Sequence, residues 1–395
     1  MANENTNRIV SIDLLRGIVM VIMALDHVRD FIHYGAFFSD PTDLATTTPA
    51  HFATRWITHF CAPVFVFLAG TAAYLYGAKQ QTKKALSRFL FTRGLWLIFV
   101  EIVIVNFGIN FDIHFSLIFL QVIWAIGICM LVLAALVYLP MPVIVAFGGL
   151  LVAGHNLLDD FSVTGGGPAA YVWYLLHEQN FIPTSPATGF FVVYPLIPWI
   201  GVMALGYGLG ALYRRGYDGA KRRKLLWQLG LAATALFILL RTFNIYGEPS
   251  PWGPQDSAAM SVVSFLNLSK YPPSLLFLLM TLGPALLFLA WSETRFQNPM
   301  NAFPIIGRVP FFYYIVHFYL AHLAGVVGVL IAGRPWTDMI LGFKGFTQPV
   351  LADYGYSLHV VYLVWLLVVV LLFPVCRWYD RYKRTNKDKW WLSYL

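Results

Sequence analysis

The sequence predicts an all-α integral membrane protein, a polytopic bundle of about ten transmembrane helices with both termini in the cytoplasm. Of its 395 residues, 58% are hydrophobic and only 12% are charged, and the mean hydropathy is +0.66. These values lie outside the range of soluble domains. A helix that crosses the bilayer core needs about 20 apolar residues. Ten stretches approach this requirement, at roughly residues 9–32, 53–77, 93–110, 115–138, 142–157, 192–212, 225–243, 273–291, 303–331 and 358–379. The ninth stretch is long enough to tilt, kink or contain an additional element.

The positions of lysine and arginine predict the topology, because cytoplasmic loops of membrane proteins carry an excess of these residues. Three segments are basic: residues 79–93, residues 214–224 and the tail at about residues 380–395. The intervening loops carry aspartate and glutamate instead. The net charge of +8 therefore reflects topology, and the basic tail suits an anionic inner leaflet of the lipid bilayer. No nucleic-acid motif is present, so we expect no nucleic-acid partner and one membrane domain over residues 1–395.

The cysteines indicate neither a disulfide framework nor a metal cage. Cys61, Cys129 and Cys376 all fall in predicted spans, and no CxxC pair occurs. The chain also lacks an HExxH motif. We therefore predict no metal cofactor.

Ionisable residues are concentrated in the first helical hairpin. The stretch 9–32 carries Asp13, Arg16, Asp26, His27 and Asp30. Such side chains are costly in hydrocarbon and usually line a polar cavity. At 100° per residue, Asp13, Arg16, His27 and Asp30 fall within a stripe about 100° wide. One face of the first helix should therefore look into the bundle.

The two hairpin histidines are expected at similar depth. His27 lies about 21 Å along the helix axis from Asp13, near the extracytoplasmic surface of the bilayer. The second span runs back inward and carries Arg55 and His59 shortly after its outer start. We therefore expect His27 and His59 in the outer third of the membrane, within reach of one cavity.

Further polar residues extend this cavity toward both surfaces. Asn106 and Gln121 lie near the outer ends of the third and fourth spans, and His317 lies in the ninth. A cytoplasmic ring is predicted from Arg88, Arg93 and Arg308. Together these residues describe a conduit with a basic cytoplasmic mouth and histidine chemistry at the far end. Plainer interpretations are an intramembrane ion pair for Asp13 with Arg16 and interhelical hydrogen bonds for Asn106 and Gln121.

An imidazole beside a carboxylate suits two kinds of chemistry. It can act as a general base on a hydroxyl or amine, or as a nucleophile that carries an acyl group. The same residues also suit the proton relay of a transporter or exporter of a small polar solute. The two halves of the chain show no inverted repeat, which weighs against the transporter.

Four segments resemble a known family. They are Ser11–Ile18 followed by Asp26-His27, the stretch His59–Gly70, Ile118-Phe119-Leu120-Gln121, and Gly307-Arg308 followed by Tyr314 and His317. Together they are similar to the heparan-α-glucosaminide N-acetyltransferase-like family of transmembrane acyltransferases. The resemblance covers most of the chain.

The resemblance implies an acetyl-CoA-dependent acyltransferase. Acetyl-CoA would bind on the cytoplasmic side, and a histidine would pass the acetyl group to an extracytoplasmic sugar amine or hydroxyl. The family's catalytic histidine precedes the second helix, where His51 is the nearest match, so His27, His51 and His59 all remain candidates. The resemblance also suggests a homodimer, and we expect the bacterial plasma membrane as its location.

Site roles follow as hypotheses. His27 or His59 activates the acceptor or takes the acetyl group, and Asp26 or Asp30 orients the imidazole. Arg88, Arg93 and Arg308 meet the coenzyme A phosphates. Asn106 and Gln121 bind the thioester carbonyl or the oxyanion. Asp13, Arg16, Arg55 and His317 complete the predicted substrate-binding set.

Overall fold

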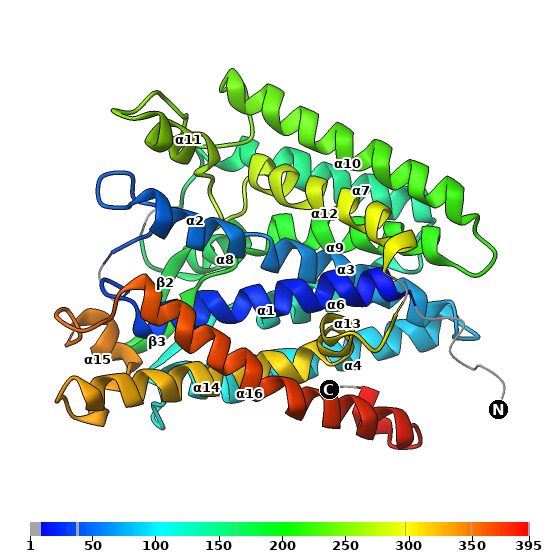
Figure 1. Cartoon of the computed structure of the whole chain (residues 1–395). Coiled ribbons are helices and arrows are strands. Elements are labelled where there is room, and N and C mark those ends of the chain that lie inside the picture. Colours follow the sequence, from blue (N-terminus) through cyan, green and yellow to red (C-terminus); the bar gives the residue numbers. More distant parts are fainter. Residues whose placement is uncertain (1–8, 37–38, 164, 297, 349, 394–395) are drawn as a thin grey trace.

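The fold is taken from a computed structural model that describes residues 9–36, 39–163, 165–296, 298–348 and 350–393. The predicted domain (1–395) and basic tail (about 380–395) therefore both extend beyond the described residues. Within them the chain forms a helical bundle with a small sheet at one end (Figure 1).

The predicted spans correspond to helices. Eight continuous helical segments of the described chain are long and apolar enough to cross a membrane. Helix α6 is shorter, and α1 is 23 residues long but more heavily charged. The all-α polytopic fold is therefore confirmed. The spanning segments are α1 (Val10–Ile32), α2 (Pro49–Thr58) with α3 (Cys61–Gly77), α4 (Lys83–Val100) with α5 (Asn106–Asn110), α6 (Val122–Leu136), α7 (Met141–Gly154), α9 (Leu196–Gly210), α10 (Gly219–Thr242), α12 (Leu275–Arg295), α14 (Pro310–Ile331) and α16 (Leu358–Thr385).

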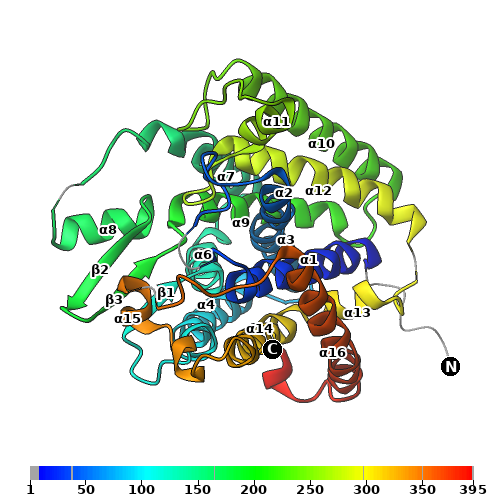
Figure 2. The same cartoon turned by 60° about the vertical axis from the view of Figure 1, so that its left-hand side comes forward.

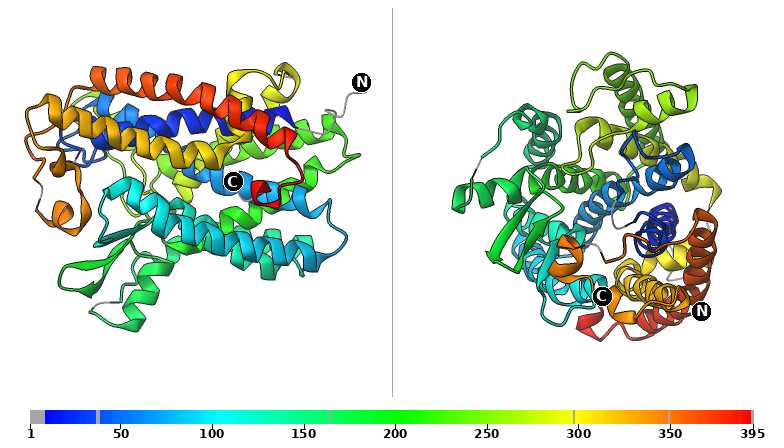
Figure 3. Two further views of the ribbon diagram at one scale, coloured as in Figure 1. Left: turned by 90° about the horizontal axis from the view of Figure 1, so that it is seen from below. Right: turned by 90° about the vertical axis from the view of Figure 1, so that its left-hand side faces the viewer.

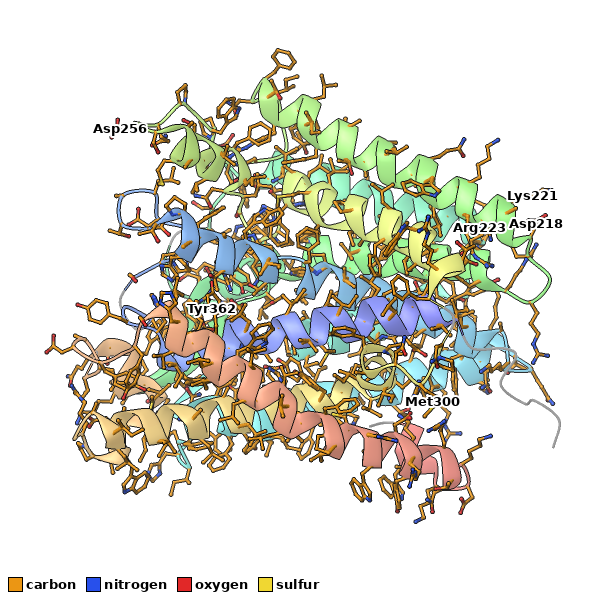
Figure 4. The ribbon with its side chains drawn as sticks, viewed as in Figure 1. Asp218, Lys221, Arg223, Asp256, Met300 and Tyr362 are labelled. Carbon is orange, nitrogen blue, oxygen red and sulfur yellow. The ribbon has the colours of Figure 1, made fainter. Side chains whose placement is uncertain are left out.

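Charge is distributed along the bundle as the topology requires. Helix α1 begins and α16 ends at the same end of the bundle (Figure 1). Figure 4 places Lys221 and Arg223 at that end and Asp256 at the opposite one. We accordingly treat the end that carries the start of α1 as cytoplasmic.

Two predicted spans are interrupted near a proline. The second span breaks at His59 between α2 and α3. Pro63 has no N–H to donate to the carbonyl group of residue 59, which removes one bond of a continuous helix. The stretch 303–331 divides into α13 (Ala302–Arg308) and α14, which begins at Pro310, a position that favours proline. Of the three alternatives left open for that stretch, tilt, kink or an additional element, the structure shows the additional element.

The helix predicted over residues 115–138 is wrong at its start. Residues Leu117–Leu120 form strand β1, which pairs in parallel with β3 (Thr188–Val192), and β3 pairs antiparallel with β2 (Asn180–Ser185). Periodicity cannot distinguish a short apolar strand from a buried helix. The strand partner also lies about 70 residues further along the chain, where no local pattern reports it.

The sheet lies with helix α8 (Pro168–Leu176) at the outer end of the bundle, where it projects to one side (Figure 2). Two short helices, α11 (Ala258–Leu266) and α15 (Gly342–Thr347), belong to the other outer loops. Short 3₁₀ turns occur at His155–Leu158, Ala211–Tyr213, Trp336–Met339 and Trp390–Ser393.

Helix α1 is the centre of the site-bearing half. It packs against α2, α3, α12, α13, α14 and α16, and the end-on view shows it between α3 and the pair α14–α16 (Figure 3). Gly17 and Gly307 allow α1 and α13 to approach closely, because a Cβ on either glycine would collide with the backbone of the other helix. The contact fixes the cytoplasmic half of α1 in the bundle.

Candidate active site

A cavity of about 520 Å³ lies at the outer end of the bundle, within the usual size range for small-molecule sites. It lies between the outer end of α1, the α2–α3 segment, the end of β1, α14 and α15. Of the predicted residues it brings together Asp26, His27, Asp30, Arg55 and Gln121. Arg29 also contributes to its wall.

Asp26 is the electrostatic centre of the outer cavity. Its carboxylate forms ion pairs with Arg29 (2.8 Å) and Arg55 (2.5 Å) and lies 3.9 Å from the Lys270 ammonium. Three cations from three segments therefore converge on one buried carboxylate. In this arrangement Asp26 holds the cavity wall together and does not contact an imidazole directly.

His27 is the histidine that faces the outer cavity. Its Nδ1 atom lies 3.7 Å from the Asp30 carboxylate, which leaves Nε2 as the nitrogen that can meet an acceptor. The ring packs against Phe318 at 3.9 Å and His317 at 5.1 Å between centroids. His317 itself is fully buried, and its Nδ1 contacts the Tyr313 carbonyl group at 3.0 Å. His317 thus packs against the His27 ring and does not itself line the cavity.

The other candidate histidines lie outside the cavity lining. His59 is buried at the α2–α3 break against the Phe277 ring, so the expectation that it shares the cavity with His27 is wrong. The His51 ring packs against the His33 ring in a tilted arrangement, with 4.3 Å between the ring centroids. Burial and the nearby Arg29 cation lower the pKa of His33 below its ordinary value.

Sequence reasoning missed Lys270, Tyr271 and Tyr194, which line the outer cavity. Lys270 and Tyr271 come from the loop before α12. Burial would raise the pKa of the Tyr271 hydroxyl, but the Lys270 and Arg55 cations hold that pKa below its ordinary value. No motif marks these residues, because only the folded loop brings them to α1.

A second cavity, of about 300 Å³, lies at the cytoplasmic half of the bundle. Arg16, Arg93 and Lys383 contribute its basic groups. Arg16 also pairs with Asp13 at 3.5 Å and donates to the Gly307 carbonyl group at 3.1 Å. Lys383, from the cytoplasmic end of α16, was recognised in the sequence only as part of the basic terminus.

The two cavities share three lining residues: Phe65 of α3, Val122 of α6 and Tyr314 of α14. One cavity carries basic groups toward the cytoplasm, and the other carries the His27–Asp30 pair toward the outside. The bundle is therefore hollowed from both ends, with these three side chains at the boundary.

Asn106 and Gln121, from the third and fourth predicted spans, have different surroundings. The Asn106 amide donates to the carbonyl groups of Glu101 (2.8 Å) and Phe119 (3.0 Å) and accepts from the Phe119 N–H (2.7 Å). It therefore fastens β1 to the π-helical turn at Glu101–Val105. Gln121 follows β1 directly and faces the outer cavity.

Two residues that were predicted to bind phosphate, Arg88 and Arg308, do not line the second cavity, the inner one at the cytoplasmic half of the bundle. Arg88 is exposed. Arg308 is buried and binds Asp380 through two hydrogen bonds of 2.7 and 2.6 Å. Its guanidinium also donates to the Pro299 carbonyl group. In this position Arg308 joins α13 to α16.

This ion pair gives a prediction for stability. Arg308→Met should lower the free energy of unfolding by about 3–5 kcal/mol, because it leaves the Asp380 carboxylate buried with a weaker partner. The matched variant Arg384→Met removes an exposed partner of the same carboxylate and should cost about 0–1 kcal/mol. Cys61, Cys129 and Cys376 are buried, so a thiol-reactive dye reports unfolding on heating. Equal melting temperatures for both variants would contradict the prediction.

Comparison with known proteins supports the family resemblance. The family described as heparan-alpha-glucosaminide N-acetyltransferase, catalytic, matches residues 8–246. This segment supplies most of the residues that line both cavities, including those from α1, the α2–α3 segment, β1 and α6. No curated protein matches the chain significantly. Since the match covers more than half of the 395 residues, the chain belongs to the heparan-alpha-glucosaminide N-acetyltransferase catalytic family, a family of membrane N-acetyltransferases.

Proposed function

We propose that this protein transfers an acetyl group from cytoplasmic acetyl-CoA, through the bundle, to an amine or hydroxyl of an extracytoplasmic sugar. The observation that carries the proposal is the pair of cavities that meet at Phe65, Val122 and Tyr314. A transferase whose donor and acceptor lie on opposite sides of a membrane needs such an arrangement. The family assignment supplies the reaction class.

The inner cavity suits the donor. Arg16, Arg93 and Lys383 would attract the phosphates of coenzyme A. Most of the remaining lining is apolar, including Leu68, Ala69 and Met130, which suits the thin pantetheine arm. The thioester would then reach the boundary between the cavities.

The outer cavity suits the acceptor and the proton transfer. The acceptor nitrogen or oxygen attacks the thioester carbonyl carbon, forms the new bond to it, and loses its proton to His27. The carbon–sulfur bond breaks, and the coenzyme A thiolate leaves with the proton that His27 took, so that His27 returns to its neutral form. Asp30 orients the His27 imidazole and stabilises its charged form. Gln121, which also lines this cavity, would donate a hydrogen bond to the oxyanion.

The test uses purified protein, [¹⁴C]acetyl-CoA and glucosamine as the acceptor probe. We expect labelled N-acetylglucosamine and free coenzyme A in equal amounts. Solute flux in proteoliposomes without any dependence on coenzyme A would instead favour a transporter. Absence of acetyl-CoA binding would refute the proposal, whichever acceptor the protein uses.

A blocking substitution tests the passage separately from the chemistry. Val122→Trp places a large ring where the two cavities meet. Transfer should fall by at least tenfold while acetyl-CoA still binds the inner cavity. The matched variant Val132→Trp adds the same ring to α6 at a position that lines neither cavity, so it should leave transfer unchanged. Equal transfer by both variants would count against a passage through this boundary.

A further inference from the structure

A cluster of metal-binding side chains lies outside both cavities. His155 begins the 3₁₀ turn after α7, Asp159 follows that turn, and His177 comes directly after α8. One nitrogen from each imidazole and one carboxylate oxygen all lie within 4.8 Å of one another. Among the described residues, this is the one group of three such side chains that is close enough to hold an ion. None of the three lines a cavity of the proposed transferase.

The imidazoles are buried without adequate partners. His155 is 2% exposed and His177 is 4% exposed. No ring nitrogen of either residue makes a hydrogen bond of normal geometry. The Pro273 carbonyl group lies close enough to His155 to influence it, yet not in hydrogen-bond geometry. Buried polar groups of this kind usually have a partner, and the convergence of these ring nitrogens with a carboxylate oxygen suits a shared one.

The donor geometry suits a small divalent ion. The His177 Nε2 atom lies 3.2 Å from the Asp159 Oδ1 atom. Two donors bound tetrahedrally at about 2.0–2.1 Å would be about 3.3 Å apart. The third donor, from His155, lies within the same 4.8 Å and needs only a small adjustment of its side chain.

A second residue orients the carboxylate. The Asn156 amide donates to the other oxygen of Asp159 at 2.7 Å, and its own oxygen accepts from the Leu275 N–H at 2.9 Å. Outer partners of this kind are typical of metal sites, where they fix the direction of a ligand. Here they leave the Asp159 Oδ1 atom directed at His177.

We propose that His155, Asp159 and His177 form a binding site for a zinc-class divalent metal ion on the extracytoplasmic side. Two imidazole nitrogens and one carboxylate oxygen are ligands that Zn²⁺ prefers, whereas Ca²⁺ and Mg²⁺ prefer oxygen alone. The ion would tie the end of α7 to the end of α8. It would thereby hold the segment that leads into β2 and β3, and β3 pairs with β1 beside Gln121.

The sequence did not reveal this site because its ligands have no motif spacing. His155 and Asp159 share one turn, whereas His177 lies on the far side of a glycine-rich loop and α8. Only the packing of α8 against the bundle brings the third ligand into place. The expectation that the chain binds no metal rested on the absence of short motifs.

The test titrates the full-length protein, purified with a tag that contains no histidine and stripped with EDTA, with Co²⁺. We expect one Co²⁺ per chain, with the intense visible absorption of four-coordinate cobalt and displacement by Zn²⁺. His177→Gln should lose this spectrum, and Asn156→Ala should weaken binding about 10–100-fold. His359→Gln removes an exposed histidine of α16 and should bind as the wild type does.

Two results would overturn the proposal: a wild-type protein that binds no Co²⁺ at micromolar concentrations, and a His177→Gln variant with an unchanged spectrum. If a variant fails to fold, the wild-type titration still decides the question. EDTA should also lower the melting temperature of the wild type and leave that of His177→Gln unchanged. The readouts do not depend on acetyl transfer, so the metal site and the proposed function stand or fall separately.

Discussion

His27→Gln should lower kcat for acetyl transfer by about 10²–10⁴-fold, the usual contribution of a general base. His27 is the candidate histidine that both lines the outer cavity and lies near a carboxylate, Asp30, at 3.7 Å. Glutamine keeps most of the side-chain volume but cannot accept the acceptor's proton. Acetyl-CoA binding should remain, because its predicted contacts lie in the other cavity. Initial rates with [¹⁴C]acetyl-CoA and glucosamine measure the effect.

Three further variants make this result specific. His359→Gln changes an exposed histidine that lines neither cavity and should keep full activity. His59→Gln changes the buried histidine at the α2–α3 break. If His59→Gln loses transfer and His27→Gln keeps it, the role assigned here to His27 is wrong. Asp30→Asn should lower kcat less than His27→Gln, because it weakens the orientation of the base without removing it.

Asp26→Asn should destabilise the fold by about 3–5 kcal/mol, the usual cost of breaking a buried ion pair. The substitution removes the negative charge on which Arg29, Arg55 and Lys270 converge. All three cations are largely buried, with 5%, 14% and 9% of their side chains exposed. Asp30, which pairs with Arg29, would offset them in part. Thermal unfolding in detergent, followed with the thiol-reactive dye, measures the loss.

Asp30→Asn is the matched control for stability. Asp30 is 46% exposed, so its pair with Arg29 should contribute only about 0–1 kcal/mol. The two variants should therefore differ in their main effect. Asp26→Asn should mainly lower stability, and Asp30→Asn should mainly lower activity. Asp26→Asn with the melting temperature of the wild type would contradict the central position given to its carboxylate.

The sequence predicts the bundle because hydrophobic runs of membrane length are a strong local signal. It also predicts the polar face of α1, because ionisable residues in such a run must look inward. That argument placed Asp26, His27 and Asp30 at one cavity. It failed for His59, since depth along a helix does not give its rotation, and the break before α3 alters that rotation.

Features that depend on distant pairing could not be read from the sequence. Strand β1 exists because β3 pairs with it across about 70 residues. Arg308 looked like a phosphate ligand until α16 supplied Asp380 beside it. Lys270 and Tyr271 reach the outer cavity through a loop whose path no periodicity encodes. In each case a partner far along the chain decides the role of the residue.

The sidedness of transfer distinguishes movement of the acetyl group through the bundle from a reaction on one face of the membrane. Proteoliposomes sorted for one orientation, with the basic end of the bundle outward, receive [¹⁴C]acetyl-CoA outside and contain glucosamine inside. We predict labelled N-acetylglucosamine inside the vesicles and free coenzyme A outside, with both products formed about 10²–10⁴-fold more slowly by His27→Gln. Product that forms only when donor and acceptor share one side of the membrane would contradict the account.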